Sequence, residues 1–359
     1  MDSNDLLQIN KNQAFLSSRM DNFKFNLKRG HGNLLSYALD RFRWHIYPRL
    51  HHVSKFPTHI DIELSSSCNL NCPMCYTTTD EFKQNVDRTL LDFNLYKKII
   101  DECSKHRSHY SIRLSWRGEA FLNPQIYEMI KYAKQKGIKE VSTLTHGGFL
   151  DPEKFEELVD LGLDWLTISF DGVDETYEQV RAPLKYKESL EKIKKYSEIK
   201  KRKKSVKPVL KIQGIWPAIA KNPEKFFSTF EPLVDQVASL PLVDYLRKDT
   251  EIEYIENFTC PVLYQRMTVD ALGQVKLCYN DEMGNINVGD LNFQTVEEVW
   301  RGELLQNARD IHLKHKGVEE LEPCKHCFYP RKTEEKLIKI DGREISGDGV
   351  SNRSQMLGT

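Results

Sequence analysis

A short cysteine-rich loop carries the most specific chemical signal in the sequence. Cys68, Cys72 and Cys75 lie in the stretch CNLNCPMCY with C-x3-C-x2-C spacing. Three thiolates on one loop can ligate three irons of a [4Fe–4S] cubane and leave the fourth iron open to a non-protein ligand. A structural zinc ion would need a fourth protein ligand, and none lies close in the sequence. We therefore expect an iron–sulfur cluster here, with zinc as the alternative.

Four further cysteines form a second, dispersed set in the C-terminal part of the chain. They are Cys260, Cys278, Cys324 and Cys327, and the last two form a C-x2-C pair. Gly273 precedes Cys278 by five residues and predicts a turn just ahead of that thiolate. Judged alone, four thiolates fit a zinc ion about as well as an iron–sulfur cluster. The eighth cysteine, Cys103, is expected to be an ordinary residue of a helix face.

The elements that must position these loops follow a regular rhythm. Strands are predicted over residues 59–66, 111–116, 140–145, 165–170, 208–215 and 236–240, and helices over 93–106, 123–137, 151–162, 185–200 and 226–234. This alternation predicts a parallel α/β sheet. Six such units are too few for a closed eight-fold barrel, so we expect an open or partial (β/α)6 barrel. Its ligands should lie beyond the C-terminal ends of the strands.

The regions on either side of this barrel differ from it in pattern. Residues 1–55 are interpreted as an N-terminal helical lead-in, 56–250 as the barrel, 251–330 as a small cysteine-rich domain and 331–359 as a loose polar tail. Within the cysteine-rich domain, short strands are predicted at 264–269 and 274–278, followed by a helix from about 296 to 313.

Composition narrows the class of partner. Lys+Arg and Asp+Glu both number 52, which does not suggest a nucleic-acid-binding protein. The basic stretch 194–204 is interpreted as the solvated end of a helix. No apolar stretch reaches 18 residues and the start of the chain does not resemble a signal peptide, so we expect a cytoplasmic protein without a membrane partner. Disulfides are rare in that compartment, which again favours metal ligation for the cysteines.

The cysteine loop and its place after the first strand resemble the radical S-adenosylmethionine (radical SAM) superfamily. The residues around Cys75, with Met74 before it and Tyr76 after it, are similar to the pattern of the SPASM/Twitch subgroup. The resemblance implies a partial barrel and a cluster whose open iron chelates S-adenosylmethionine. It also implies a 5′-deoxyadenosyl radical that abstracts hydrogen from a substrate.

The resemblance extends to single residues on later strands. Gly118 and Glu119 stand at a GGE-like motif beside the methionine amino group, although Arg117 replaces the first glycine and Ala120 the usual proline. The remaining cofactor contacts implied are Thr145 and Ser169 near the ribose, Arg181 at the methionine carboxylate and Ile215 near the adenine. An arginine suits a carboxylate because its planar fork can donate two parallel hydrogen bonds.

The second cysteine set is similar to a shortened SPASM domain of the Twitch type. Four cysteines, where the full domain has seven or more, imply one fully ligated auxiliary [4Fe–4S] cluster and hence two clusters in all. Twitch relatives oxidise or epimerise a carbinol carbon of sugars and cyclitols, and a flavodoxin or ferredoxin is the implied electron donor. Asp281 is the candidate proton acceptor, and Arg247 or Tyr279 the candidate for holding a hydroxyl or anionic group; all three also fit ordinary loop residues.

Two alternatives to small-molecule oxidation stay open. One is maturation of a ribosomal peptide, by thioether formation or side-chain oxidation. The 55-residue lead-in is short for the peptide-clasping domain of such enzymes, and the cysteine count is low. The other is a non-catalytic metal-binding scaffold, which does not explain the presence of Ser169 and Arg181.

Overall fold

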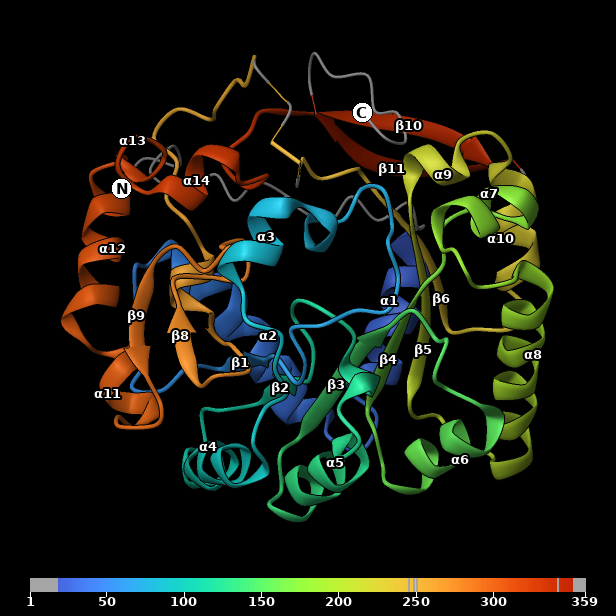
Figure 1. The fold of residues 1–359 in the computed structure, drawn as a ribbon, viewed down its shortest axis with the longest axis horizontal. Coiled ribbons are helices and arrows are strands. Elements are labelled where there is room, and N and C mark those ends of the chain that lie inside the picture. Colours follow the sequence, from blue (N-terminus) through green and yellow to red (C-terminus); the bar gives the residue numbers. More distant parts are fainter. Residues whose placement is uncertain (1–18, 245, 248, 250, 341, 351–359) are drawn as a thin grey trace.

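Six parallel strands form the larger part of one curved sheet. The computed structural model describes residues 19–350 apart from 245, 248, 250 and 341. The strands stand side by side in chain order: β1 (His59–Ile62), β2 (Ser111–Arg113), β3 (Glu140–Thr145), β4 (Trp165–Ser169), β5 (Val209–Ile215) and β6 (Gln236–Leu240). Figure 1 shows them as an open arc. The prediction of a partial barrel is confirmed.

The outer face of this arc is apolar and covered by helices. These are α4 (Phe93–Lys105), α5 (Ile126–Gln135), α6 (Pro152–Asp160), α8 (Tyr186–Lys203) and α10 (Pro223–Phe230). Asp92 begins α4, because its carboxylate accepts hydrogen bonds from the backbone N–H groups of Asn94 and Leu95, both at 2.9 Å. Ile60 and Ile112 point into the same core as Cys103, which is buried on α4. Strand alternation therefore leaves the polar residues for the concave face.

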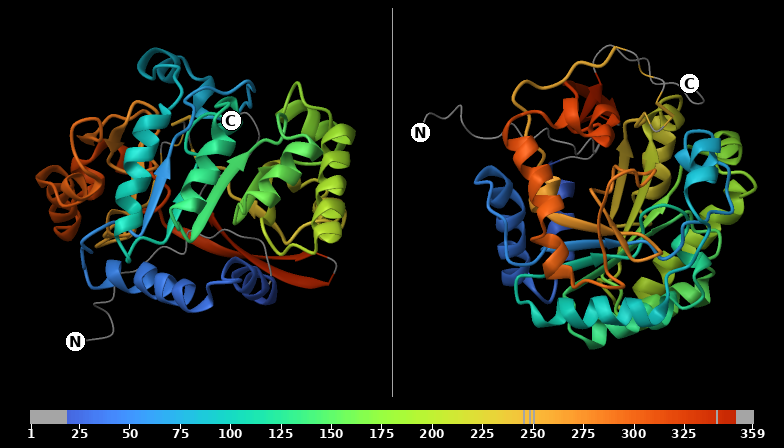
Figure 2. Two further views of the ribbon diagram at one scale, coloured as in Figure 1. Left: turned by 90° about the horizontal axis from the view of Figure 1, so that it is seen from below. Right: turned by 60° about the vertical axis from the view of Figure 1, so that its left-hand side comes forward.

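Two N-terminal helices cover the end of the arc at which the strands begin. They are α1 (Arg19–Arg29) and α2 (Leu34–Arg49), and Figure 2 shows them running beneath the strands. The guanidinium of Arg29 on α1 donates to both carboxylate oxygens of Glu140 at the start of β3, at 3.1 and 2.6 Å. The loops that carry the candidate site leave the strands at the opposite end.

The cysteine-rich region continues the same sheet. β7 (Arg266–Val269) pairs in parallel with β1, and β8 (Gln274–Lys276) and β9 (Asn287–Asp290) follow antiparallel, which makes a nine-stranded sheet. Strand β9 was not among the predicted elements.

The predicted helix over 296–313 is two helices. They are α11 (Val296–Trp300) and α12 (Glu303–Leu313), separated at Gly302. The helix is interrupted there because Trp300 is fully buried and its indole donates to the carbonyl of Ser54 at 2.9 Å. In addition, the guanidinium of Arg309 donates to the carbonyl of Trp300 at 3.0 Å. Two short helices, α13 (Gly317–Glu320) and α14 (Glu322–His326), lead to the last cysteines.

The expectation of a loose tail after residue 331 is wrong for the described part of it. β10 (Thr333–Ile340) and β11 (Arg343–Val350) form an antiparallel hairpin around Gly342, whose φ is +74°. Alternation in TEEKLIKI and the Asp-Gly dipeptide at 341–342 are hairpin signals that the polar composition concealed. Figure 1 shows the hairpin on the open side of the arc, reaching toward α9 (Trp216–Ile219).

The remaining short elements lie in the loops. They are η1 (Tyr76–Thr78), α3 (Asp80–Asn85), η2 (Ala120–Leu122), α7 (Asp174–Val180) and η3 (Val262–Tyr264). The basic end of α8 pairs with neighbouring acids, including Lys203 with Glu156 at 2.9 Å and with Asp160 at 2.7 Å. Among the described residues, every helix is too short or too polar to cross a membrane.

Candidate active site between two cysteine sets

The first cysteine set follows β1 and packs as one group. Cys68, Cys72 and Cys75 contact the same small apolar cluster, which also includes Ile215 at the end of β5. Burial raises the pKa of Cys68 to about 11 and also raises the pKa of Cys72. Buried thiols that lie close together become thiolates readily only beside a positive charge, which a bound metal centre supplies. This donor set therefore fits an iron–sulfur cluster.

Glu119 organises the next strand ends. Its carboxylate accepts hydrogen bonds from the hydroxyl of Thr145 at 2.7 Å and from the backbone N–H of His146 at 3.0 Å. The backbone N–H of Glu119 donates to the carbonyl of Ser67 at 2.8 Å, directly before the cysteine loop. Gly118 has a φ of +59°, and a Cβ there would stand 2.3 Å from the carbonyl oxygen of Ser65. The structure thus brings Gly118, Glu119 and Thr145 together beside the first cysteine set.

Arg181 reaches the cysteine loop from the end of α7. Its Nε donates to Asp171 at 2.7 Å, and its Nη1 lies 3.6 Å from the sulfur of Cys72. The other oxygen of Asp171 accepts from the backbone N–H of Ile215 at 2.8 Å. Asp171 therefore links two predicted cofactor residues, a role that sequence reasoning missed. Ser169 ends β4 just before it and pairs in register with Gln213 of β5.

Arg117, the departure from the family's glycine, forms a buried ion pair. Its Nε and Nη2 donate to the two carboxylate oxygens of Glu63 at 2.7 and 2.8 Å, and both side chains are almost fully buried. Glu63 also accepts from the backbone N–H of Ala271 at 3.0 Å, in the turn between β7 and β8. The pair therefore fastens the loop after β2 to the cysteine-rich region.

The second cysteine set gathers around the end of α14. The thiols of Cys260, Cys278, Cys324 and Cys327 are free, and Cys260 and Cys327 add to the effect of burial in raising the pKa of Cys278 and Cys324.

Burial raises the pKa of Cys260 to about 11 and that of Cys327 to about 12, and a bound metal centre would favour their thiolate forms. Asn280 donates to the sulfur of Cys327 at 3.2 Å, and the Nε2 of His312 lies 3.5 Å from the sulfur of Cys324. Among the described residues, no three His, Cys, Asp or Glu side chains stand at the spacing of a single bound ion.

One loop contacts the surroundings of both cysteine sets. It comprises residues 279–284, directly after Cys278. Met283 packs against Tyr76 and Phe82 beside the first set, whereas Asn280 contacts Cys327 of the second.

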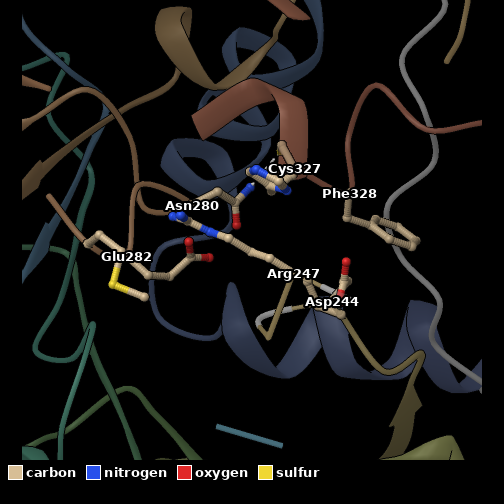
Figure 3. Close-up of a pocket in the computed structure, with 9 residues that line it drawn as sticks. Asp244, Arg247, Asn280, Glu282, Cys327 and Phe328 are labelled. Carbon is tan, nitrogen blue, oxygen red and sulfur yellow. Dashed lines mark hydrogen bonds between the residues drawn. The ribbon is translucent and has the colours of Figure 1, made fainter. Parts of the chain in front are cut away.

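A pocket opens next to this loop, with about 320 Å³ of empty volume including its solvent-open part. Figure 3 shows the side chains of Arg247 and Glu282 turned toward the same space near Asn280. Asp244, Cys327 and Phe328 form other parts of its wall.

The three predicted substrate-side residues have different positions. Both oxygens of Asp281 accept backbone N–H groups at 2.9 Å, from Asn285 and Ile286, so its carboxylate shapes the turn. The hydroxyl of Tyr279 donates to Tyr329, away from the residues that line the pocket. Of the three, Arg247 lines the pocket, where it also pairs with Glu81 at 3.3 Å.

Glu282 is the pocket residue that sequence reasoning missed. Burial raises the pKa of its carboxyl to about 8, with a smaller contribution from the charge of Asp281. The only available signal was a pair of adjacent carboxylates after Cys278, and a sequence does not show which of the two faces a pocket.

Family models match both parts of this arrangement. The model of the radical SAM superfamily matches residues 62–211, and that of the iron–sulfur cluster-binding domain SPASM matches residues 260–328. The chain is a radical SAM protein with a SPASM-type C-terminal domain. Its radical SAM region contains the first cysteine set and the Glu119 network, and its SPASM region spans the second set.

Among curated proteins, this radical SAM protein is similar to the tungsten-containing aldehyde ferredoxin oxidoreductase cofactor-modifying protein of Pyrococcus furiosus. The two are 29% identical over 113 residues, which are 32% of this chain and 30% of that protein. The chain thus spans about a third of the length of that relative, and the next two relatives are covered to 28% and 34%.

Solved structures with this fold include one with a small ligand and one with a peptide. BtrN in complex with AdoMet and 2-DOIA is 18% identical, with a TM-score of 0.53 over 77% of this chain and 94% of that one. Streptococcus suis SuiB bound to the precursor peptide SuiA is 13% identical, with a TM-score of 0.52 over 77% of this chain and 72% of that one. At these identities the likeness shows the fold alone.

Proposed function

We propose that this radical SAM protein oxidises a carbinol carbon of a sugar or cyclitol, or epimerises it through the same radical. The observation that supports this most is the pocket beside residues 279–284, which has Glu282 and Cys327 of the second set in its wall and adjoins a loop that also packs beside the first set. A substrate held there would be near one set that generates a radical and another that can accept an electron.

The chain offers ligands for both cofactor sites. Cys68, Cys72 and Cys75 would hold a [4Fe–4S] cluster with one open iron, and Cys260, Cys278, Cys324 and Cys327 an auxiliary [4Fe–4S] cluster. When bound, S-adenosylmethionine and the first cluster would supply a radical able to remove hydrogen, and the auxiliary cluster would supply an electron acceptor. The residues proposed to hold S-adenosylmethionine are Gly118, Glu119, Thr145, Ser169, Arg181 and Ile215. A flavodoxin or ferredoxin is the proposed electron donor.

Oxidation of a carbinol also releases the hydroxyl proton, which needs an acceptor. Glu282 is the proposed acceptor in place of Asp281, because its carboxyl lies in the pocket wall whereas both oxygens of Asp281 bind backbone N–H groups. Arg247 provides N–H donors in the same pocket for a hydroxyl or anionic group of the substrate.

Iron content and cofactor cleavage test the proposal. Anaerobic reconstitution should give about eight irons per chain, four for each cubane. Replacing Cys68, Cys72 and Cys75 by Ala should remove about half of the iron and abolish formation of 5′-deoxyadenosine. Replacing Cys324 and Cys327 should spare 5′-deoxyadenosine and abolish the oxidised product. Full turnover in the second variant would refute the electron-accepting role.

Peptide maturation is the second candidate, because the SuiB structure with a precursor peptide shares the fold. Transfer of deuterium into 5′-deoxyadenosine separates the two. The reduced holoprotein would be incubated with S-adenosylmethionine and either the peptide or the non-peptide fraction of a deuterated cell extract. Label from the non-peptide fraction alone is expected; label from the peptide fraction alone would favour the second candidate.

A further inference from the structure

A layer of polar side chains crosses the concave face of the sheet below the candidate site. Thr268, Asp61, Arg113, Ser142 and Trp165 are register partners from strand to strand, and we call them the Arg113 row. They share the face on which the His59 imidazole contacts the hydroxyl of Ser111 at 2.6 Å and Asp61 at 3.1 Å. Ile60 and Ile112 point to the opposite, helix-covered face.

Several cations lie around this row. Three cations surround the indole ring of Trp165: Arg29 at 4.3 Å, Arg113 at 5.5 Å and Lys211 at 5.9 Å. Arg29 is neutralised by Glu140. Asp61, the carboxylate of the row, pairs with Arg266 at 3.1 Å. Among the described residues, Arg113 has no carboxylate within ion-pair distance.

The same face presents hydrogen-bond donors that lack acceptors. The Nε of Arg266, the indole Nε1 of Trp165 and the hydroxyl of Thr268 are buried without a hydrogen-bond partner in the described structure. Buried polar groups in folded proteins are nearly always satisfied, so a group of unused donors points to a missing acceptor. Arg113 and Trp165 are only half-buried, whereas their neighbours on the helix side are fully buried, so part of each of these two residues is accessible to solvent.

Burial of these cations has an electrostatic cost that an anion would relieve. Burial lowers the pKa of Arg113; the charge of Asp61 opposes this shift, and the positive charges of Arg266 and Arg29 add to it. Burial, with the charge of Arg113, also lowers the pKa of Lys211. A phosphate or carboxylate would accept hydrogen bonds from Arg113 and offset the repulsion that Arg113 meets from Arg266 and Arg29.

We infer that the Arg113 row is a binding subsite for an anionic group of the substrate, a phosphate or a carboxylate. Trp165 precedes Ser169 by four strand residues, which places the row about 13 Å below the proposed cofactor contacts. That depth suits a compact substrate such as a sugar phosphate or sugar acid, with its reacting carbon near the proposed cofactor contacts and its anionic group at the Arg113 row. The inference rests on the proposed function, whose substrate class it narrows.

Equilibrium binding tests the subsite without turnover. Isothermal calorimetry on the anaerobically reconstituted holoprotein would compare glucose 6-phosphate, glucuronate, inorganic phosphate and uncharged glucose. We expect at least one anion to bind stoichiometrically and at least tenfold more tightly than glucose. Tighter binding of glucose 6-phosphate would identify phosphate as the preferred group, and tighter binding of glucuronate would identify carboxylate. Equal affinity for the anions and glucose, or no saturable binding, would overturn the inference.

Two variants locate the binding on Arg113. Arg113→Gln should weaken the preferred anion about ten- to hundred-fold, as expected for loss of a charge-assisted donor pair. Arg113→Lys keeps the charge but not the fork, so its loss should be smaller. Arg107→Gln, which alters an exposed arginine outside the row, is the matched control and should not alter affinity.

Iron content and melting temperature identify a variant that has not folded. If Arg113→Gln does not fold, Arg113→Lys decides. Wild-type affinity for the preferred anion in Arg113→Lys, together with equal binding of that anion and of uncharged glucose, would overturn the assignment. Anion binding without any turnover would support the subsite and contradict the proposed oxidation instead.

Discussion

At the scale of single residues, the candidate site depends on which carboxyl groups are already engaged. Asp281 and Glu282 are adjacent in sequence, yet the first holds a turn and the second faces the pocket. Likewise Asp171 holds Arg181, and Glu63 holds Arg117. Of the two adjacent carboxyl groups, Glu282 is therefore the one that we propose to meet a substrate.

Glu282→Gln should separate radical generation from product formation. We expect 5′-deoxyadenosine to form while the oxidised product falls by about a hundredfold, as for loss of a general base. Because the pKa of Glu282 is raised to about 8, wild-type product formation should increase as pH rises through about 8, and the variant should lack that increase. Glu303→Gln, which alters an exposed carboxylate, serves as the control. A variant with wild-type product rates would remove Glu282 from the mechanism.

The same shift in pKa has a consequence for stability that needs no substrate. The folded-state pKa lies above the ordinary value of 4.5, so folding favours the protonated carboxyl. Its contribution is present at low pH and is lost as pH rises toward about 8. The free energy of unfolding should therefore fall more steeply with pH in the wild type than in Glu282→Gln, measured by anaerobic urea denaturation.

At the scale of elements, sequence rhythm was sufficient for most of the barrel. β3 and β6 have the predicted bounds, because Glu140–Thr145 and Gln236–Leu240 are short β-rich runs between clear helix signals. The hairpin β10–β11 was missed because its strands are as polar as a disordered tail. The break at Gly302 was missed because it depends on Trp300 and Arg309, which meet only in the folded chain.

The site itself was predictable where its residues belong to recognisable sequence motifs. The cysteine sets and Glu119 follow from motifs, whereas Glu282, Asp171 and the Arg113 row depend on contacts across distant strands. Periodicity assigns Arg113 to a face of a strand, but not the charges that surround it there.

Gly118→Ala tests how tightly the loop after β2 must approach the cysteine loop. Gly118 and Gly137 both have positive φ, at +59° and +82°, so an alanine strains the backbone at either site. A Cβ at Gly118 would also stand 2.5 Å from the carbonyl of Ser67, whereas nothing lies within 4 Å at Gly137. We expect Gly118→Ala to lose iron and cofactor cleavage. Gly137→Ala should keep both, and its free energy of unfolding should fall by only the roughly 1 kcal/mol expected of backbone strain. Equal behaviour of the two would show that the close approach is unimportant.

At the scale of the whole molecule, the barrel and the SPASM-type region are joined by a shared sheet and a buried ion pair. Arg117 and Glu63 connect β1, the loop after β2 and the turn after β7. The candidate pocket and the Arg113 row are both built from residues of these two regions.

Arg117→Met should destabilise both regions together. It leaves the Glu63 carboxylate buried without its partner, which costs about 3–5 kcal/mol. Thermal unfolding followed anaerobically should show one lower transition and a loss of iron from both cysteine sets. Adding Glu63→Leu should recover much of the lost stability, because the buried charge is then gone. Two separate transitions, with only one displaced, would show that the regions unfold independently.

The parallel pairing of β1 with β7 also limits which SPASM-type regions can be exchanged between such proteins. A donor SPASM-type region grafted onto this barrel would have to supply a strand that matches β1 over His59–Ile62, together with a backbone N–H for Glu63. Without that match, the backbone groups of β1 that face β7 would become an open sheet edge, on which chains associate with one another. Chimeras joined within the stretch before β7 should therefore remain soluble only when strand and turn are inherited as one block with the barrel.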